Sequence, residues 1–164
     1  MLTVERLREL LHYDPLTGVF TRLTKVGGQP VGSVAGSAHI KGYVELRVDG
    51  RAYLAHRLAW LYVHGEWPIG KLDHRDTIRT HNWIANLRPA TDQQNAQNVN
   101  AHRDSRTGIK GVSIHTKSGR FRATIRVQGK QKHLGYFATV EEASAAYQEA
   151  AAKQYGEYHR ADPT

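Results

Sequence analysis

The stretch LDHRDTIRTHNWIANLRPATDQQN, residues 72–95, concentrates side chains that can bind metal ions, accept protons or donate hydrogen bonds. Asp73 and His74 are adjacent, and Asn86 and Asn95 follow 12 and 21 positions after the histidine. Apolar residues are few in this stretch. A segment of this composition adds little to a hydrophobic core, so the pattern indicates a functional site.

The same stretch predicts a strand, a loop and a helix in that order. Residues 72–74 are expected to end a short strand, and residues 75–85 to form a polar loop. Thr91 and Gln94 then form a capping box at the start of a helix that carries Asn95. This order predicts that the aspartate of the strand and the asparagine of the helix lie close together.

A carboxylate and an amide oxygen on converging elements suit a hard cation such as Mg²⁺, which keeps water ligands and takes others from a phosphate. Asp73 and Asn95 are the candidates for this pair. His74 is next to the aspartate but points to the other side of the strand. There it would face the cleft as a neutral imidazole that can deprotonate water.

Each of these residues also has a structural explanation. Asp73 fits a turn cap, Asn86 fits a loop residue that satisfies backbone groups, and Asn95 fits an exposed helix face. For Asn82 we favour this kind of loop role over a functional one. For His56, at the start of a predicted helix among apolar neighbours, we favour a buried structural histidine.

The chain has 164 residues and no cysteine, so it forms one ordinary domain or two small ones without disulfides or cysteine-bound zinc. Glu5 and Glu9 interrupt the N-terminal leucines, which is wrong for a signal peptide, and no apolar run reaches membrane-spanning length. We therefore expect a cytoplasmic protein with no membrane partner.

Positive charge is concentrated in residues 101–135, which hold nine Lys or Arg and one acidic residue. Their net charge of +8 equals that of the whole chain. A solvated basic face is one explanation. We favour a nucleic acid as partner, because neutralising phosphates releases condensed counterions.

The segment GRFRATIRVQG, residues 119–129, alternates strictly between polar and apolar side chains. Arg120, Arg122, Thr124 and Arg126 share one face of the predicted strand, and the other face is apolar. Strands are also expected before and after it, with Val112 and Ile114 of the first pointing inward, followed by a helix over residues 139–155. Three antiparallel strands backed by one helix leave a basic sheet face that fits the DNA major groove.

Residues 108–156 resemble the AP2 DNA-binding domain in three motifs: the Gly-x-x-Gly-Val opening, the Leu-Gly-Tyr-Phe third strand and the Glu-Glu-Ala-x-x-Ala-Tyr helix. Histidines and a lysine stand where plant members often have tryptophans. The resemblance implies the fold and binding to double-stranded DNA. The expected DNA contacts are Lys110, Arg120, Arg122, Arg126 and Lys132.

The N-terminal part is organised differently, with a helix at residues 3–11, a turn at 13–18 and a hairpin around Asp49-Gly50. HRLAWLYVHG, residues 56–65, is expected to form a helix with Leu58, Trp60 and Leu61 mostly in the core. We predict a first domain over residues 1–98 with its core motif at 43–98, a linker at 99–107 and a second domain over 108–160.

The spacing of Asp73, His74, Asn86 and Asn95, with HRLAW upstream and NLRPAT between the asparagines, resembles the phage-type HNH endonucleases of the ββα-metal superfamily. This resemblance implies that His74 is the general base and that Asp73 and Asn95 bind one Mg²⁺ or Mn²⁺ ion per site. It also implies that Asn86 orients the imidazole. The chain departs from the pattern at the final position, where Asn95 stands for a histidine, and in the loop RDTIRTHN.

Together these observations predict an α+β protein in which a ββα-metal nuclease domain precedes a small AP2-like sheet domain. The expected function is metal-dependent cleavage or nicking of DNA by a homing-type, phage-encoded enzyme with no obligate protein partner. The alternative is a non-catalytic, sequence-specific DNA-binding regulator on a degenerate HNH scaffold. An RNA-binding module is disfavoured because the basic strand face lacks exposed aromatic residues in the sequence pattern.

Overall fold

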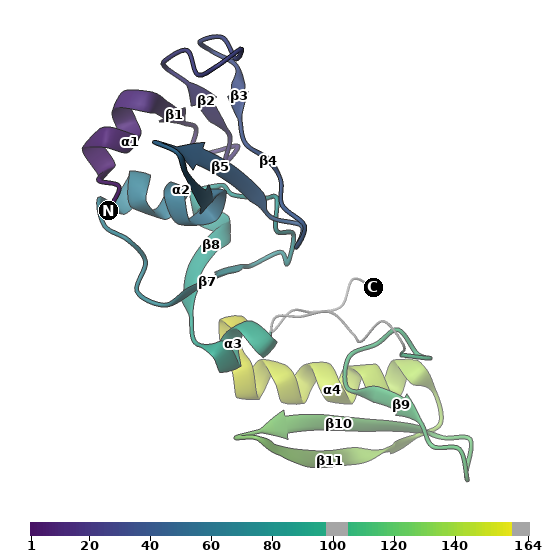
Figure 1. The fold of residues 1–164 in the computed structure, drawn as a ribbon. Helices are drawn as coiled ribbons and strands as arrows, with labels where there is room; N and C mark the ends of the chain where they lie inside the picture. The colour runs from purple at the N-terminus through teal and green to yellow at the C-terminus, as the bar shows by residue number, and fades with distance from the viewer. Residues whose placement is uncertain (98–104, 159–164) are drawn as a thin grey trace. The chain divides into compact units, whose positions relative to one another are not determined.

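The computed structural model describes residues 1–97 and 105–158 (Figure 1). Its internal contacts divide the chain into two compact units, Met1–Asn95 and Ala96–Thr164, here called unit 1 and unit 2. Both combine helices with small antiparallel sheets, which confirms the predicted α+β class. Most of the predicted linker lies outside the described residues. Within the described ranges, no helix has the length and apolar character needed to cross a bilayer.

Unit 1 begins with a short helix and a three-stranded antiparallel sheet. Helix α1 (Val4–Leu10) begins at Thr3, whose hydroxyl accepts a hydrogen bond from the backbone of the first turn. The sheet has the strand order β1-β2-β3. Its strands are β1 (Leu11–Tyr13), β2 (Phe20–Arg22) and β3 (Val34–Ala35).

A second antiparallel sheet and a helix complete the core of unit 1. The sheet contains β4 (Ser37–Ala38), β5 (Val44–Val48) and β6 (Arg51–Leu54), and the predicted turn at Asp49-Gly50 joins the last two strands with positive φ at both residues. Helix α2 (Ala55–His64) ends at a left-handed Gly65, as predicted. Leu58 and Leu61 of this helix are buried, whereas Trp60 is only half-buried and packs on His64.

The stretch that carries the candidate site forms a two-stranded ribbon followed by a helix. Strand β7 (Lys71–His74) pairs with β8 (Leu87–Ala90), and a single 3-10 turn, η1 (Ile84–Asn86), leads into the second strand. Helix α3 (Asp92–Gln97) follows, with the predicted capping box between Thr91 and Gln94. The sequence did not predict β8.

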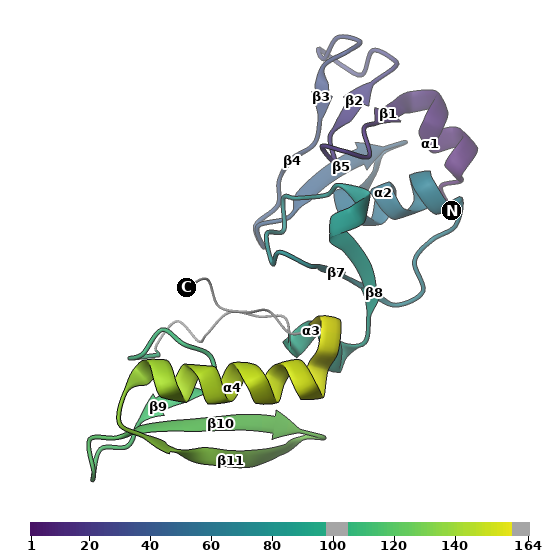
Figure 2. The same ribbon diagram turned by 180° about the vertical axis from the view of Figure 1, so that it is seen from behind.

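Unit 2 is a three-stranded antiparallel sheet, with the order β11-β10-β9, packed against one long helix (Figures 1 and 2). The strands are β9 (Val112–Ile114), β10 (Phe121–Val127) and β11 (Lys130–Phe137). Helix α4 (Val140–Tyr155) begins with the predicted capping box and is followed by the 3-10 turn η2 (Gly156–Tyr158). It lies along one face of the sheet and leaves the other without a helix from this unit.

The core of unit 2 confirms the predicted alternation along β10. Phe121, Ala123, Ile125 and Val127 contribute to a cluster that also contains the buried Ala143, Tyr147 and Ala151 of α4. Small side chains on the helix let it approach the sheet closely. Ile114 differs from the prediction, because 40% of its surface is exposed at the end of β9.

One irregularity modifies this sheet. The pairing of β10 with β11 shifts between Ala123 and Thr124, whose partners are Gly135 and His133, so Leu134 is an extra residue in β11. A bulge of this kind increases the local twist of a sheet.

Candidate active site

His74 is the last residue of β7 and is buried, with only 5% of its surface exposed. Its imidazole contacts two other rings that come from different elements. The ring of His56, in the first turn of α2, lies edge-on at 5.2 Å between centroids, and the ring of Tyr43 lies at 6.1 Å. Burial is the main cause that holds the pKa of His74 below its ordinary value, so the ring is neutral near pH 7.

The side chain of Asn82 makes a buried hydrogen bond with this imidazole. Asn82 Oδ1 lies 3.1 Å from His74 Nε2, and Asn82 itself is 2% exposed. Its Nδ2 donates to the carbonyl of Thr80 at 3.0 Å, which is the local loop role favoured from the sequence. That interpretation was incomplete, because the amide oxygen contacts the candidate base.

Asn86 organises the loop between the two strands. Its Oδ1 accepts a hydrogen bond from the backbone N–H of Asp76, and its Nδ2 donates to the Asp76 carboxylate and to the carbonyl of His81. Asp76 also pairs with the His81 ring at 2.6 Å. Burial acts to raise the pKa of Asp76, but the hydrogen bonds from Asn86 and His81 outweigh it and lower that pKa. The carboxylate of Asp76, with its hydrogen bonds from Asn86 and His81, therefore holds the loop together.

Asp73 is buried and forms an ion pair with Arg88, which the sequence analysis did not single out. The two residues lie opposite each other in the β7–β8 ribbon, and Arg88 donates from Nε and Nη2 to Asp73 Oδ2 at 3.0 and 2.8 Å. Both side chains are about 5% exposed. A charge pair in such a dry position depends on both partners, because either one alone would be a buried uncompensated charge.

Asn95 lies on α3 and is half-buried. Its backbone N–H donates to Thr91 in the first turn of the helix. At the start of the β7–β8 ribbon, Lys71 pairs with Asp92 of the same helix at 2.7 Å, which ties α3 to the strand that carries Asp73. The predicted order of strand, loop and helix is thus present, with an additional strand before the helix.

His56 is buried as predicted for a structural histidine, but it is not fully satisfied. Its Nδ1 has no hydrogen-bond partner among the described residues. Burial, with smaller contributions from His74 and Arg57, lowers its pKa to about 3. The neutral ring packs against both Tyr43 and His74, at 5.2 Å between centroids in each case.

In unit 2, the predicted DNA-contact residues do not all share one face. Arg120 and Arg126 are exposed, and Arg122 is half-buried, with a hydrogen bond to Ser113 at 3.3 Å. Lys110 and Arg122 line the same cavity. Lys132 is exposed but pairs with Ile125, and opposite residues of an antiparallel pair point to the same side, so it lies on the helix side of the sheet.

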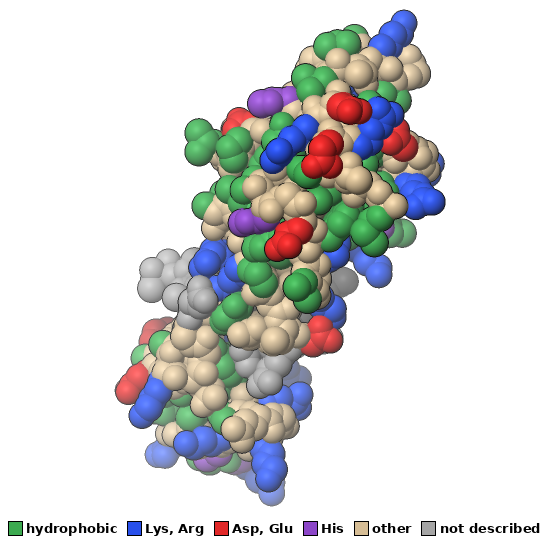
Figure 3. Space-filling model, turned by 90° about the vertical axis from the view of Figure 1, so that its left-hand side faces the viewer, with side chains coloured by type: hydrophobic (Ala, Val, Ile, Leu, Met, Phe, Trp, Pro, Cys, Tyr) green, Lys and Arg blue, Asp and Glu red, His purple; other side chains and the backbone are tan. Residues whose placement is uncertain are grey.

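The basic face also carries an exposed aromatic ring. Tyr136 pairs with Arg122 in the sheet register, and 45% of its surface is exposed. The rings of His115 and His133 lie 4.8 and 4.6 Å from it. The basic strand itself has no aromatic side chain on this face, as expected, but Tyr136 of the neighbouring strand β11 adds one to the sheet. In Figure 3, Lys and Arg side chains gather at the bottom of the view, over β10 and β11.

Comparison with known proteins gives a class for the region around His74. Residues 53–97 match the family model described as HNH endonuclease. This match supports a nuclease. It covers β7, β8 and the polar residues of unit 1 described above, which are His56, Asp73, His74, Asn82, Asn86, Arg88 and Asn95.

A relative in Escherichia phage T7, Protein 3.8, is 30% identical to the chain over 80 residues. The matched region is 48% of this chain and 66% of the relative, so the chain spans just under two thirds of that protein's length. No solved structure matches the chain.

Proposed function

We propose that unit 1 hydrolyses phosphodiester bonds in double-stranded DNA, nicking or cutting it, in a metal-dependent reaction, and that unit 2 holds the DNA. One observation carries this proposal: a buried His74, fixed by an amide side chain, lies within the region that resembles HNH endonucleases. A neutral imidazole in a confined position is suited to accept a proton from water.

The proposed metal ligands are Asp73 and Asn95, with one Mg²⁺ or Mn²⁺ ion per site. No group of three or more His, Asp or Glu residues in the described chain could hold a metal ion, so an ion here would complete its shell with water and phosphate oxygens. Two oxygen ligands from the protein fit the way Mg²⁺ binds beside phosphates. When bound, the ion stabilises the negative charge that develops on the phosphate.

The remaining tasks fall to residues of the chain. His74 accepts the proton of the attacking water. Asn86 keeps the loop over residues 75–86 in place through its three hydrogen bonds, and in the proposed mechanism this also orients the imidazole. Arg88 fixes the carboxylate of Asp73 in one position.

We propose an AP2-like role for unit 2, in which Arg120, Arg122 and Arg126 contact DNA from one sheet face and Lys110 contributes from the adjacent cavity. Bidentate arginine contacts to guanine edges and phosphate contacts are the expected interactions. The relative in a phage supports a phage-encoded protein. We further propose that it is an enzyme of the homing type that acts on DNA in a bacterial cell.

The alternative is a DNA-binding regulator without catalytic activity. The observation that favours it is the Asp73–Arg88 ion pair, since Arg88 occupies part of the carboxylate that a metal ion would use. Cleavage of DNA that depends on a divalent ion would exclude this alternative.

The test is incubation of supercoiled and linear DNA with the protein and Mg²⁺ or Mn²⁺, with and without a chelator. We expect nicked or linear products only with the ion, and a loss of about 10²-fold or more in His74→Ala, the usual scale for a general base. His12→Ala, at an exposed histidine of β1, is the matched control and should cleave normally. Cleavage by His74→Ala at the wild-type rate would remove His74 from the mechanism.

A further inference from the structure

The hydrogen bond between Asn82 and His74 has a defined direction. The Nδ2 group of Asn82 donates to the Thr80 carbonyl, so its Oδ1 is the atom that faces His74. An amide oxygen only accepts hydrogen bonds. The Nε2 atom of His74 must therefore carry the proton, and in a neutral imidazole the lone pair then belongs to Nδ1.

We propose that Asn82 is a positioning residue of the nuclease site, which holds His74 in the Nε2–H tautomer and makes Nδ1 the atom that accepts the proton. This inference rests on the function proposed above. It assigns to Asn82 the contact that the family resemblance had implied for Asn86, whose side chain bonds to Asp76 and His81. Asn82 thus positions the imidazole, and Asn86 holds the loop.

The N-terminal part of unit 1 holds the backbone of Asn82 in place. The hydroxyl of Tyr13, at the end of β1, donates to the Asn82 carbonyl at 2.8 Å in a buried position. The ring of Tyr13 packs against Phe20 and Tyr62, at 4.7 and 5.5 Å between centroids, in a cluster of three aromatic rings. Tyr13, which lies 69 positions earlier in the sequence, therefore fixes the backbone position of Asn82, whose side-chain amide contacts His74.

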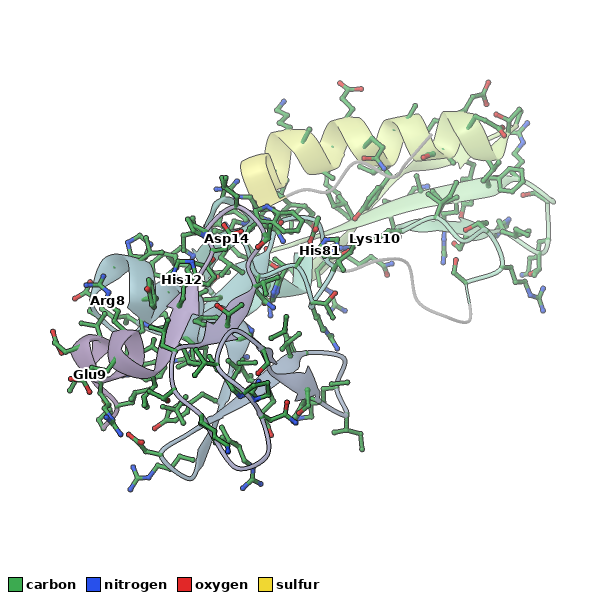
Figure 4. The ribbon with its side chains drawn as sticks, turned by 90° about the horizontal axis from the view of Figure 1, so that it is seen from above. Arg8, Glu9, His12, Asp14, His81 and Lys110 are labelled. Carbon is green, nitrogen blue, oxygen red and sulfur yellow. The ribbon has the colours of Figure 1, made fainter. Side chains whose placement is uncertain are left out.

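The turn after Tyr13 closes against the same backbone. Asp14 organises this turn through hydrogen bonds to the backbone of Leu16 and the hydroxyl of Thr17. Gly18 has φ of 76°, and a Cβ at this position would collide with the backbone of Asn82 and Trp83. Figure 4 shows Asp14 of this turn and His81, the residue before Asn82. The turn is thus a support of the site, which explains its tight packing.

The first experiment reads the tautomer directly. Histidine labelled with ¹⁵N is incorporated, and the His74 ring nitrogens are assigned by comparison with His74→Ala at about pH 8, where an ordinary imidazole is neutral. We expect a protonated Nε2 in the wild type. A protonated Nδ1 in the wild type would overturn the proposal, whether or not the protein cleaves DNA.

The second experiment compares Asn82→Leu, which removes the acceptor, with Asn82→Asp, which keeps it. We expect Asn82→Leu to mix the tautomers and to lower kcat by roughly 10- to 100-fold, the scale of supporting contacts to a catalytic group, with little change in DNA affinity. Asn82→Asp should retain the Nε2–H tautomer and more of the activity. Wild-type kcat and an unchanged tautomer in a folded Asn82→Leu would contradict the proposal.

The third variant, Tyr13→Phe, tests the support without touching Asn82. It removes one hydroxyl and should lower kcat by a smaller factor than Asn82→Leu, with KM unchanged. If the wild type cleaves no DNA, the proposed function fails while the nitrogen spectra still decide the position of the proton. If Asn82→Leu does not fold, the wild-type spectrum and Tyr13→Phe decide the outcome.

Discussion

The two units of the chain treat their polar side chains in opposite ways. Unit 1 buries His56, Asp73, His74, Asn82, Asn86 and Arg88, whereas unit 2 keeps Arg120 and Arg126 exposed and buries an apolar cluster of α4 and β10 residues. Buried polar groups need fixed partners, and Asp73, Asn82 and Asn86 have them in unit 1. Exposed arginines stay solvated until a partner arrives. Buried and fixed polar side chains suit a catalytic site, whereas exposed arginines suit association with a polyanion.

The largest expected effect is on the stability of unit 1. Arg88→Ala leaves the buried carboxylate of Asp73 without its ion-pair partner, and breaking such pairs costs about 3–5 kcal/mol. Denaturant unfolding would measure this loss, with Arg47→Ala, at an exposed arginine of β5, as the control with little effect. Mg²⁺ should stabilise Arg88→Ala more than the wild type, because the ion would neutralise the uncompensated charge. Equal stability of Arg88→Ala and Arg47→Ala would contradict the importance of the pair.

A second comparison tests the exposed arginines. Arg126→Ala should weaken DNA binding by roughly 1–3 kcal/mol if this exposed side chain reads a base, with a relaxed preference at one base pair. Lys153→Ala, on the helix α4, is the matched control. Binding titrations at several salt concentrations separate base contacts from phosphate contacts, since loss of a phosphate contact lowers the salt slope by about one.

The outcome that would contradict this prediction is equal affinity in both variants. Neither substitution is expected to change the stability of the protein by more than about 0.5 kcal/mol, the usual range for surface positions. Unchanged stability in both variants would contrast with the large loss of stability expected for Arg88→Ala.

The smallest effect concerns pH. The pKa of His56 falls from an ordinary 6.5 to about 3 on folding, so below pH 6.5 the unfolded chain binds a proton that the folded chain does not. The contribution of this residue to stability is therefore present above pH 6.5 and is lost as the pH falls toward 3. The slope is at most about 1.4 kcal/mol per pH unit.

His56→Phe should reduce the loss of stability between pH 7 and pH 5, and His12→Phe, at an exposed histidine, should leave it unchanged. Unfolding at the two pH values measures the difference. Identical pH dependence in the wild type and His56→Phe would show that the ring takes up its proton without unfolding.

Local sequence signals predicted much of the fold. The Asp49-Gly50 turn, the capping box at Thr139 and the alternation along β10 each act within a few residues, so a single sequence contains the information. Strand β8 was missed because Pro89 and the neighbouring asparagine are unfavourable in strands. Its partner β7 stabilises it through the tertiary structure.

The sequence suggested candidate members of the site more readily than their contacts. Asp73, His74 and Asn86 became candidates through their spacing, and the structure buries all three in unit 1. Asn82 and Arg88 were not, because the contacts that give them a role come from pairing of β7 with β8 and from packing of the N-terminal turn. Asn82 precedes a tryptophan in a loop, and only the fold shows that its amide reaches the histidine. The roles of the site residues in catalysis stay predictions.

The extra residue Leu134 in β11 has a consequence for how the sequence of this protein can evolve. A bulge alters the coiling of the strand pair and the direction in which the side chains beyond it point, without changing their chemistry. Deleting or moving one residue there would turn Tyr136 and its neighbours relative to the arginines of β10. If unit 2 binds DNA as proposed, insertions and deletions in this strand pair would change its target preference and leave the proposed active site in unit 1 unchanged.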